Sequence, residues 1–114
     1  MPRLSEEEMI ARGDDYFDIA DAIYPFGDWR LRSTAKMLRE AAGHLLRCDR
    51  IAYRQMYGKI QNHKIYFREL PDDLKRQVID YVGPVVAELI DKHLVALQRP
   101  GKPERTDDRQ YRDG

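Results

Sequence analysis

The first apolar residues of the chain recur at the spacing of a helix. Ser5, with Glu8 three residues later, forms a capping-box pattern, in which each side chain accepts a backbone N–H of the other residue. Pro25 and Gly27 interrupt the pattern, and both residue types end helices. A first helix is therefore predicted between Ser5 and Pro25, with one apolar face made of Met9, Ile10, Gly13, Phe17, Ala20, Ile23 and Tyr24.

A second apolar stripe predicts a long helix that begins near Asp28 or Ser33, either of which can cap it, and closes at Gly58. The stripe comprises Leu31, Ala35, Leu38, Ala42, Leu45, Ala52 and Met56. Cations recur every three or four residues on the polar side, with one vacancy at Gly43. They predict one continuous basic ridge, a candidate nucleic-acid face formed by Arg32, Lys36, Arg39, Arg47, Arg50 and Arg54.

The last third of the chain leaves two structural alternatives open. Segment 57–68 fits a helix, a hairpin or irregular coil, and helix or coil is favoured because a lone hairpin is marginal in water. A further helix is predicted to start with Asp72 as its cap. Gly83-Pro84 interrupts its stripe, which resumes in phase, so 72–82 and 84–98 form a kinked helix or two helices nearly in line.

These elements predict an all-α fold, an irregular bundle of three to four helices within a single domain at 1–98. Segment 99–114 contains one aromatic and no aliphatic residue, so it cannot bury enough apolar surface to offset the entropy of ordering. It is predicted to be a flexible, disordered tail.

Charge is balanced overall, with 20 basic and 20 acidic side chains, but it is segregated along the chain. Segment 1–28 carries 8 acidic and 2 basic residues, and segment 29–68 carries 10 basic and 2 acidic residues. Net neutrality argues against a general nucleic-acid coat, whereas the segregation leaves room for a local basic face.

The cellular compartment is predicted from patterns that the sequence does not contain. Cys48 is the single cysteine, so a disulfide scaffold is excluded, and no segment has the pattern of a secretory signal or a membrane span. A cytoplasmic protein without membrane contact is expected. Arginine outnumbers lysine 14 to 6, which suggests a GC-rich bacterial genome.

Candidate chemistry is sparse. His44 and Cys48 lie four residues apart, a spacing that on one helix face could give half a metal site or a nucleophile with its base. No further ligand pattern accompanies them, so we expect no metal, no cofactor and no enzyme, with this pair as the residual alternative. His93 lies in the apolar stripe of the last helix, where it is either satisfied by a core hydrogen bond or a pH-sensitive interface residue.

The stretch "AIYPFGDWRLRST" gathers three aromatic residues around a helix corner. Ile23 and Phe26 are predicted to pack inward. Trp29 follows the turn at the start of a helix, where a rigid amphipathic side chain can serve as an anchor for another protein. The predicted partner-binding residues are Tyr24, Trp29, Arg30 and Arg32.

Together these features predict a small protein-binding regulator, such as an antiactivator that sequesters a transcription factor, an adaptor or an inhibitor. The alternative is a nucleic-acid-binding regulator that uses the basic ridge, with Tyr53, Tyr57 and Tyr66 available for base stacking. A small enzyme ranks third. The wide apolar arc of the last helix also predicts a homodimer, whose candidate interface residues are Val85, Val86, Leu89, Ile90, Leu94 and Leu97.

Overall fold

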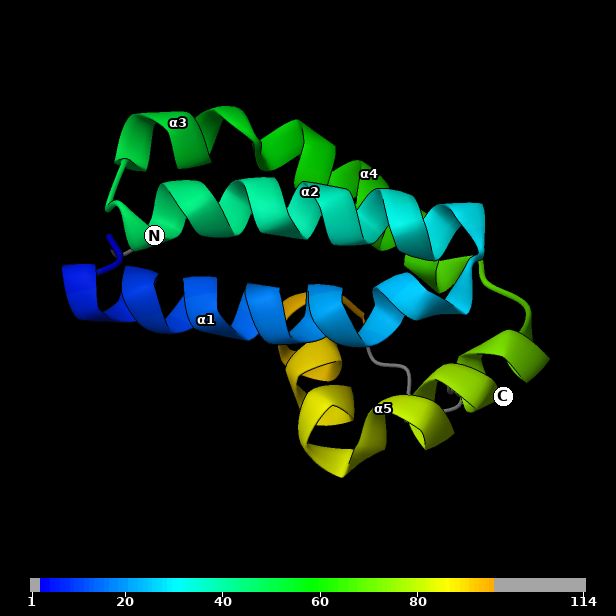
Figure 1. The fold of residues 1–114 in the computed structure, drawn as a ribbon. Coiled ribbons are helices and arrows are strands. Elements are labelled where there is room, and N and C mark those ends of the chain that lie inside the picture. Colours follow the sequence, from blue (N-terminus) through cyan, green and yellow to red (C-terminus); the bar gives the residue numbers. More distant parts are fainter. Residues whose placement is uncertain (1–2, 96–114) are drawn as a thin grey trace, which may run out of the picture.

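Two long antiparallel helices, α1 (Glu6–Ile23) and α2 (Trp29–Leu46), lie side by side in the computed structural model, which describes residues 3–95 (Figure 1). The short 3-10 turn η1 (Tyr24–Phe26) and Gly27 join them. Gly27 has φ 78°, a left-handed conformation that glycine adopts without a Cβ clash. The corner that Pro25 and Gly27 predicted is therefore confirmed.

Side chains cap the starts of both helices as predicted. The Glu8 amide donates to Ser5 Oγ at 3.1 Å and the Ser5 amide donates to Glu8 Oε1 at 2.8 Å, which completes the capping box. At α2, Asp28 Oδ1 accepts from the Arg30 amide at 2.8 Å. Asp28, not Ser33, is therefore the cap of the second helix.

The second helix is shorter than predicted, because α2 ends at Leu46 and does not reach Gly58. The Cys48 amide donates to the Leu45 carbonyl, and the Asp49 amide donates to the His44 carbonyl, both at 2.9 Å. This pair of bonds is a Schellman motif, and Cys48 takes the left-handed position (φ 56°) that glycine usually occupies. Asp49 then accepts from the Ala52 amide and caps the separate helix α3 (Arg50–Gln55).

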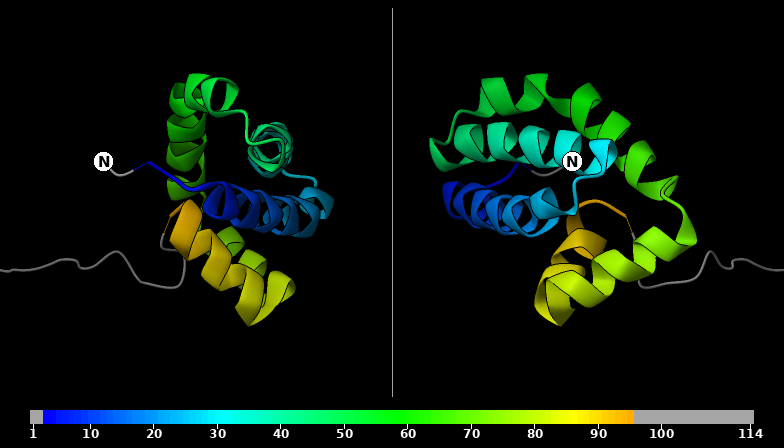
Figure 2. Two further views of the ribbon diagram at one scale, coloured as in Figure 1. Left: turned by 90° about the vertical axis from the view of Figure 1, so that its left-hand side faces the viewer. Right: turned by 45° about the vertical axis from the view of Figure 1, so that its right-hand side comes forward.

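Helix α4 (Tyr57–Arg68) resolves the ambiguity of segment 57–68 in favour of a helix, and Gly58 lies inside it. Figure 1 shows α3 and α4 running back over α2, and Figure 2 shows the same layer from two further sides. The ion pair from Lys59 Nζ to Glu40 Oε1, at 2.9 Å, joins α4 to α2.

Helix α5 (Asp72–His93) starts where the apolar stripe predicted, although Pro71 holds the cap position and no side chain caps the helix. Gly83 is non-helical within it (φ 85°, ψ 170°), and Pro84 follows. The two halves of α5 point in different directions, and the second half turns back toward α1 (Figure 1). Of the two predicted alternatives, the kinked helix is therefore confirmed and two helices nearly in line is wrong, because Gly83, with its positive φ, redirects the chain.

One apolar core holds these helices together. Phe67 of α4 and Val78 and Ile90 of α5 are fully buried. They belong to the same core as the apolar stripes of α1 and α2. The largest buried side chains from α1 and α2 are Met9, Ile19, Ile23, Leu31, Met37, Leu38 and Leu45. The all-α fold is therefore confirmed for residues 3–95, which contain helices and no strand, while the predicted tail at 99–114 lies outside the described residues.

None of the helices in segment 3–95 combines the length and the apolar character that crossing a membrane requires.

Candidate functional site

The candidate site is the corner between α1 and α2, which local hydrogen bonds make rigid. Asp28 accepts the Arg30 amide, and its carboxylate also pairs with the Arg30 guanidinium at 3.3 Å. Burial acts to raise the pKa of Asp28, but the hydrogen bonds from Arg30 outweigh it and hold the pKa below its ordinary value. The carboxylate is thus ionised and fixes the first turn of α2.

Trp29 projects outward from this rigid turn. Its side chain is 64% exposed, yet two neighbours position it. The Tyr66 ring meets the indole edge to face, with centroids 5.6 Å apart, and the Arg30 guanidinium lies 5.8 Å from the indole centroid. Both arrangements are attractive, so they orient the indole within the folded chain. Its predicted position at an exposed helix start is confirmed.

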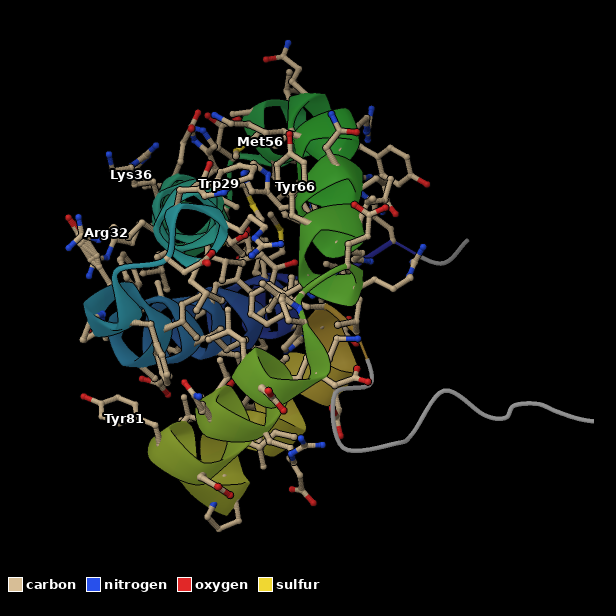
Figure 3. All side chains as sticks on the ribbon, turned by 90° about the vertical axis from the view of Figure 1, so that its right-hand side faces the viewer. Trp29, Arg32, Lys36, Met56, Tyr66 and Tyr81 are labelled. Atoms are coloured by element: carbon tan, nitrogen blue, oxygen red, sulfur yellow. The ribbon has the colours of Figure 1, made fainter. Side chains whose placement is uncertain are left out.

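Tyr24 forms a second aromatic–arginine cluster at the same end of α2. Its half-buried ring lies 5.3 Å from the Arg32 guanidinium and 5.0 Å from that of Arg39. Arg39 also pairs with Asp21 of α1 at 2.9 Å. Figure 3 shows Trp29 beside Tyr66, whereas Arg32 and Lys36 point to the other side of α2. The four predicted partner-binding residues therefore form two neighbouring clusters and not one.

The inward side of the corner agrees with the prediction in part. Ile23 is fully buried. Phe26 is half-buried, packs against the core, and meets Tyr81 of α5 edge to face with centroids 4.9 Å apart. Phe26 therefore connects the corner to α5 without being enclosed.

The prediction of one continuous basic ridge was wrong, because α2 ends before the ridge does. Arg32, Lys36 and Arg39 lie on α2, and Arg47 follows its last turn and contacts His44 Nδ1 at 3.0 Å. The two remaining cations of the ridge, Arg50 and Arg54, belong to α3. They line a cleft together with Tyr53 and Tyr57, two of the tyrosines expected to stack on bases.

His44 and Cys48 do not share a helix face, because Cys48 lies in the turn after α2. Within residues 3–95, no group of three or more His, Cys, Asp and Glu side chains is placed to hold a metal ion. The shared helix face that was predicted for this pair is therefore wrong.

The other two histidines are both buried and hydrogen-bonded. His63 lies inside α4, where Nδ1 contacts the Lys59 carbonyl at 2.8 Å and Nε2 contacts Ser33 Oγ at 3.1 Å. His93 Nε2 lies 2.8 Å from Asp15 Oδ2, as the core hydrogen-bond alternative predicted.

The candidate dimer residues divide between core and surface. Ile90 and Leu94 are buried in the core of the single chain, which takes up much of the apolar arc that suggested a dimer. Val86 and Leu89 are half-buried and Val85 is exposed, while Leu97 lies outside the described residues. The homodimer stays a prediction, and Val85 is its most accessible contact.

Sequence reasoning missed the support that Tyr66 gives to Trp29, because nothing in the local pattern places α4 against the start of α2. The Tyr66–Trp29 contact requires two residues 37 positions apart to meet. Comparisons of the chain with protein-family models, with curated proteins and with solved structures gave no match.

Proposed function

We propose that this protein is a non-catalytic regulator that binds another protein through the corner around Trp29. The observation that carries the proposal is the combination of exposure and order at the indole, which is 64% accessible but held by Tyr66 and Arg30. Tryptophan and arginine are enriched among residues that dominate binding energy, and a pre-oriented anchor loses little entropy on binding.

Trp29 and two cations on the other side of α2 together define the chemistry of a partner that reaches around this helix. Arg32 and Lys36 are exposed and make no ion pair within residues 3–95, whereas Arg30 and Arg39 are paired with Asp28 and Asp21. A complementary surface would offer an apolar pocket for the indole and carboxylates for the unpaired cations. An acidic face on a transcription factor, or on another protein that the regulator inhibits or links, fits this description.

Capture of the partner tests the proposal. Tagged wild-type protein and the Trp29→Ala variant are each exposed to extract from cells that encode the protein, and bound proteins are identified by mass spectrometry. Tyr81→Ala is the matched control, because Tyr81 is a similarly exposed aromatic residue (62%) that meets Phe26 of the corner and forms no ring contact with Trp29 among the described residues. A partner retained by wild type and Tyr81→Ala but lost with Trp29→Ala supports the proposal, whereas equal capture by all three proteins contradicts it.

A further inference from the structure

A second site lies away from Trp29, in a cleft of about 950 Å³. Its walls come from the N-terminal segment, α1, α3, α4 and the end of α5. The left view of Figure 2 shows α3, α4 and the end of α5 on the same side of the molecule. Its volume falls in the upper part of the range for small-molecule sites, about 300–1,000 Å³. We call it the cationic cleft after its six basic lining residues, Arg3, Arg12, Arg50, Arg54, Lys64 and Lys92.

The charge of the cationic cleft is one-sided. None of the described side chains that line it is a carboxylate. The side chains of Arg54, Lys64 and Lys92 form no hydrogen bond or ion pair within residues 3–95, so their charges have no internal partner. Cations gathered in a concave surface repel one another and concentrate anions from solution. The cleft is therefore electrostatically suited to an anionic ligand.

Two further cations build the wall and stay positive. Arg12 donates to the Tyr53 hydroxyl at 3.1 Å, and Arg50 donates to the Leu4 carbonyl. Burial alone would lower the pKa of Arg12, but its hydrogen bond to Tyr53 and the nearby Glu8 raise it overall. These contacts fix Tyr53 and tie α3 to the first helix.

Tyr16 lies below the cleft and adds no negative charge to it. Tyr16 is almost fully buried, and burial together with Tyr53 raises its pKa, so it stays a neutral phenol. The ring of His93 meets that of Tyr16 edge to face at 5.4 Å, and the apolar residues Met9 and Ile60 are also buried here. The floor is thus aromatic and apolar.

Tyr57 adds a ring that is free to contact a ligand. It is 68% exposed although it lines the cleft, and it lies between Arg54 and Lys64 in the sequence. An exposed ring beside unpaired cations is the combination that proteins use to bind nucleotides, with the ring stacked on a base and the cations on phosphate.

We propose that the cationic cleft binds a nucleotide or a short single-stranded segment, with one phosphate contacted by each of Arg54, Lys64 and Lys92 and a base stacked on Tyr57. A free nucleotide and a nucleotide within a single strand share this chemistry. A duplex does not, because its base faces are covered by neighbouring base pairs. An acidic peptide offers negative charge but no flat base for Tyr57 to cover.

Fluorescence anisotropy with labelled oligothymidylate, oligouridylate and ATP tests the site, with a duplex and a polyglutamate peptide as comparison probes. We expect saturable binding of at least one single strand or of ATP, and weaker binding of the duplex and the peptide. Each phosphate contact contributes about −0.7 to the slope of log K against log salt for a single strand, so three contacts predict a slope of about −2. ATP binding without strand binding identifies a free nucleotide as the source.

Variants locate the binding. Arg54→Gln/Lys64→Gln/Lys92→Gln should abolish binding, and each single change should reduce the strand slope by about 0.7. The control Arg68→Gln/Lys75→Gln/Arg76→Gln removes the same charge from positions outside the cleft and should keep wild-type affinity. Tyr57→Ala should weaken binding roughly 5- to 150-fold, while Tyr57→Phe retains it. Circular dichroism checks that every variant is folded.

Four results would overturn the proposal. They are the absence of saturable binding up to about 100 μM protein, equal binding of the duplex or the peptide, equal loss with the control variant, and competition by pyrophosphate that matches competition by ATP. The last result would show that the base is not recognised.

Discussion

Trp29 of α2 and Tyr66 of α4 meet edge to face, with ring centroids 5.6 Å apart and ring planes inclined by 62°. Trp29 is the single tryptophan of the chain, so tryptophan fluorescence reports on the surroundings of this one residue. Because the indole is mostly exposed, we expect native emission close to that of tryptophan in water and little change in wavelength on unfolding in urea. A large red shift on unfolding would show instead that the indole is buried.

Packing at the corner predicts which substitutions affect stability. Ile23 is fully buried, so Ile23→Ala should lower the free energy of unfolding by about 2–5 kcal/mol. Phe26→Ala should lower the free energy of unfolding by a smaller amount, because the wild-type ring is only half-buried and part of its contact is with Tyr81. Urea denaturation followed by circular dichroism measures both values. A larger loss for Phe26→Ala than for Ile23→Ala would contradict this view of the corner.

Thr34 is fully buried, and its Oγ1 has no hydrogen-bond partner among the described residues. A buried polar group without a partner costs about 1–3 kcal/mol. Thr34→Val keeps the shape and removes the hydroxyl, so it should raise the free energy of unfolding by about 1 kcal/mol. Thr34→Ser keeps the hydroxyl, removes a methyl group and should lower stability. A loss on Thr34→Val would show that the hydroxyl has a partner in solution.

Two glycines should respond oppositely to the same change. A Cβ on Gly13 would lie 3.0 Å from Leu46 Cγ and 3.3 Å from the Ala42 carbonyl, whereas a Cβ on Gly58 meets nothing within 4 Å. Overpacking costs about 1–3 kcal/mol, and alanine gains about 1 kcal/mol over glycine in a helix. Thermal melts should show Gly13→Ala less stable and Gly58→Ala more stable than wild type. Equal shifts would mean that α1 and α2 separate easily at Gly13.

The environment of His93 predicts a dependence of stability on pH. Burial lowers its pKa, and Arg12 and Lys92 add to this effect, while the hydrogen bond to Asp15 opposes it. The folded protein therefore binds fewer protons than the unfolded chain between the two pKa values, and stability falls as pH drops below about 6.5. His93→Gln can still donate to Asp15, so its stability should fall less between about pH 7 and about pH 5. Parallel pH profiles of wild type and variant would contradict this.

Helix starts could be predicted from the sequence because their signals are local. Ser5, Glu8 and Asp28 act on amides two or three residues away, and the structure has each of these bonds. The break after α2 could not be predicted, because Cys48 holds a left-handed position that usually marks itself with glycine. After this break the apolar residues of the sequence continue at the same helical spacing, so the pattern gives no sign that the chain changes direction.

The candidate surfaces depend on contacts between distant residues, which sequence pattern does not specify. The exposure of Trp29 could be predicted from its place after a turn, but its contact with Tyr66 could not be predicted. The cationic cleft gathers Arg12 from an otherwise acidic helix and Lys92 from the end of the chain's last described helix. Neither residue belonged to a basic run, so only the packing of α1, α3, α4 and α5 brings them together.

The central claim is that Trp29 contributes to binding and not to folding. The most direct test measures two quantities for Trp29→Ala and Tyr81→Ala, namely the melting temperature and the dissociation constant for the captured partner. We predict that Trp29→Ala melts within a few degrees of wild type but binds roughly 30- to 1,000-fold more weakly, as loss of a central aromatic anchor costs about 2–4 kcal/mol. Tyr81→Ala should retain wild-type affinity. Wild-type affinity in Trp29→Ala, or a large loss of its thermal stability, would contradict the account.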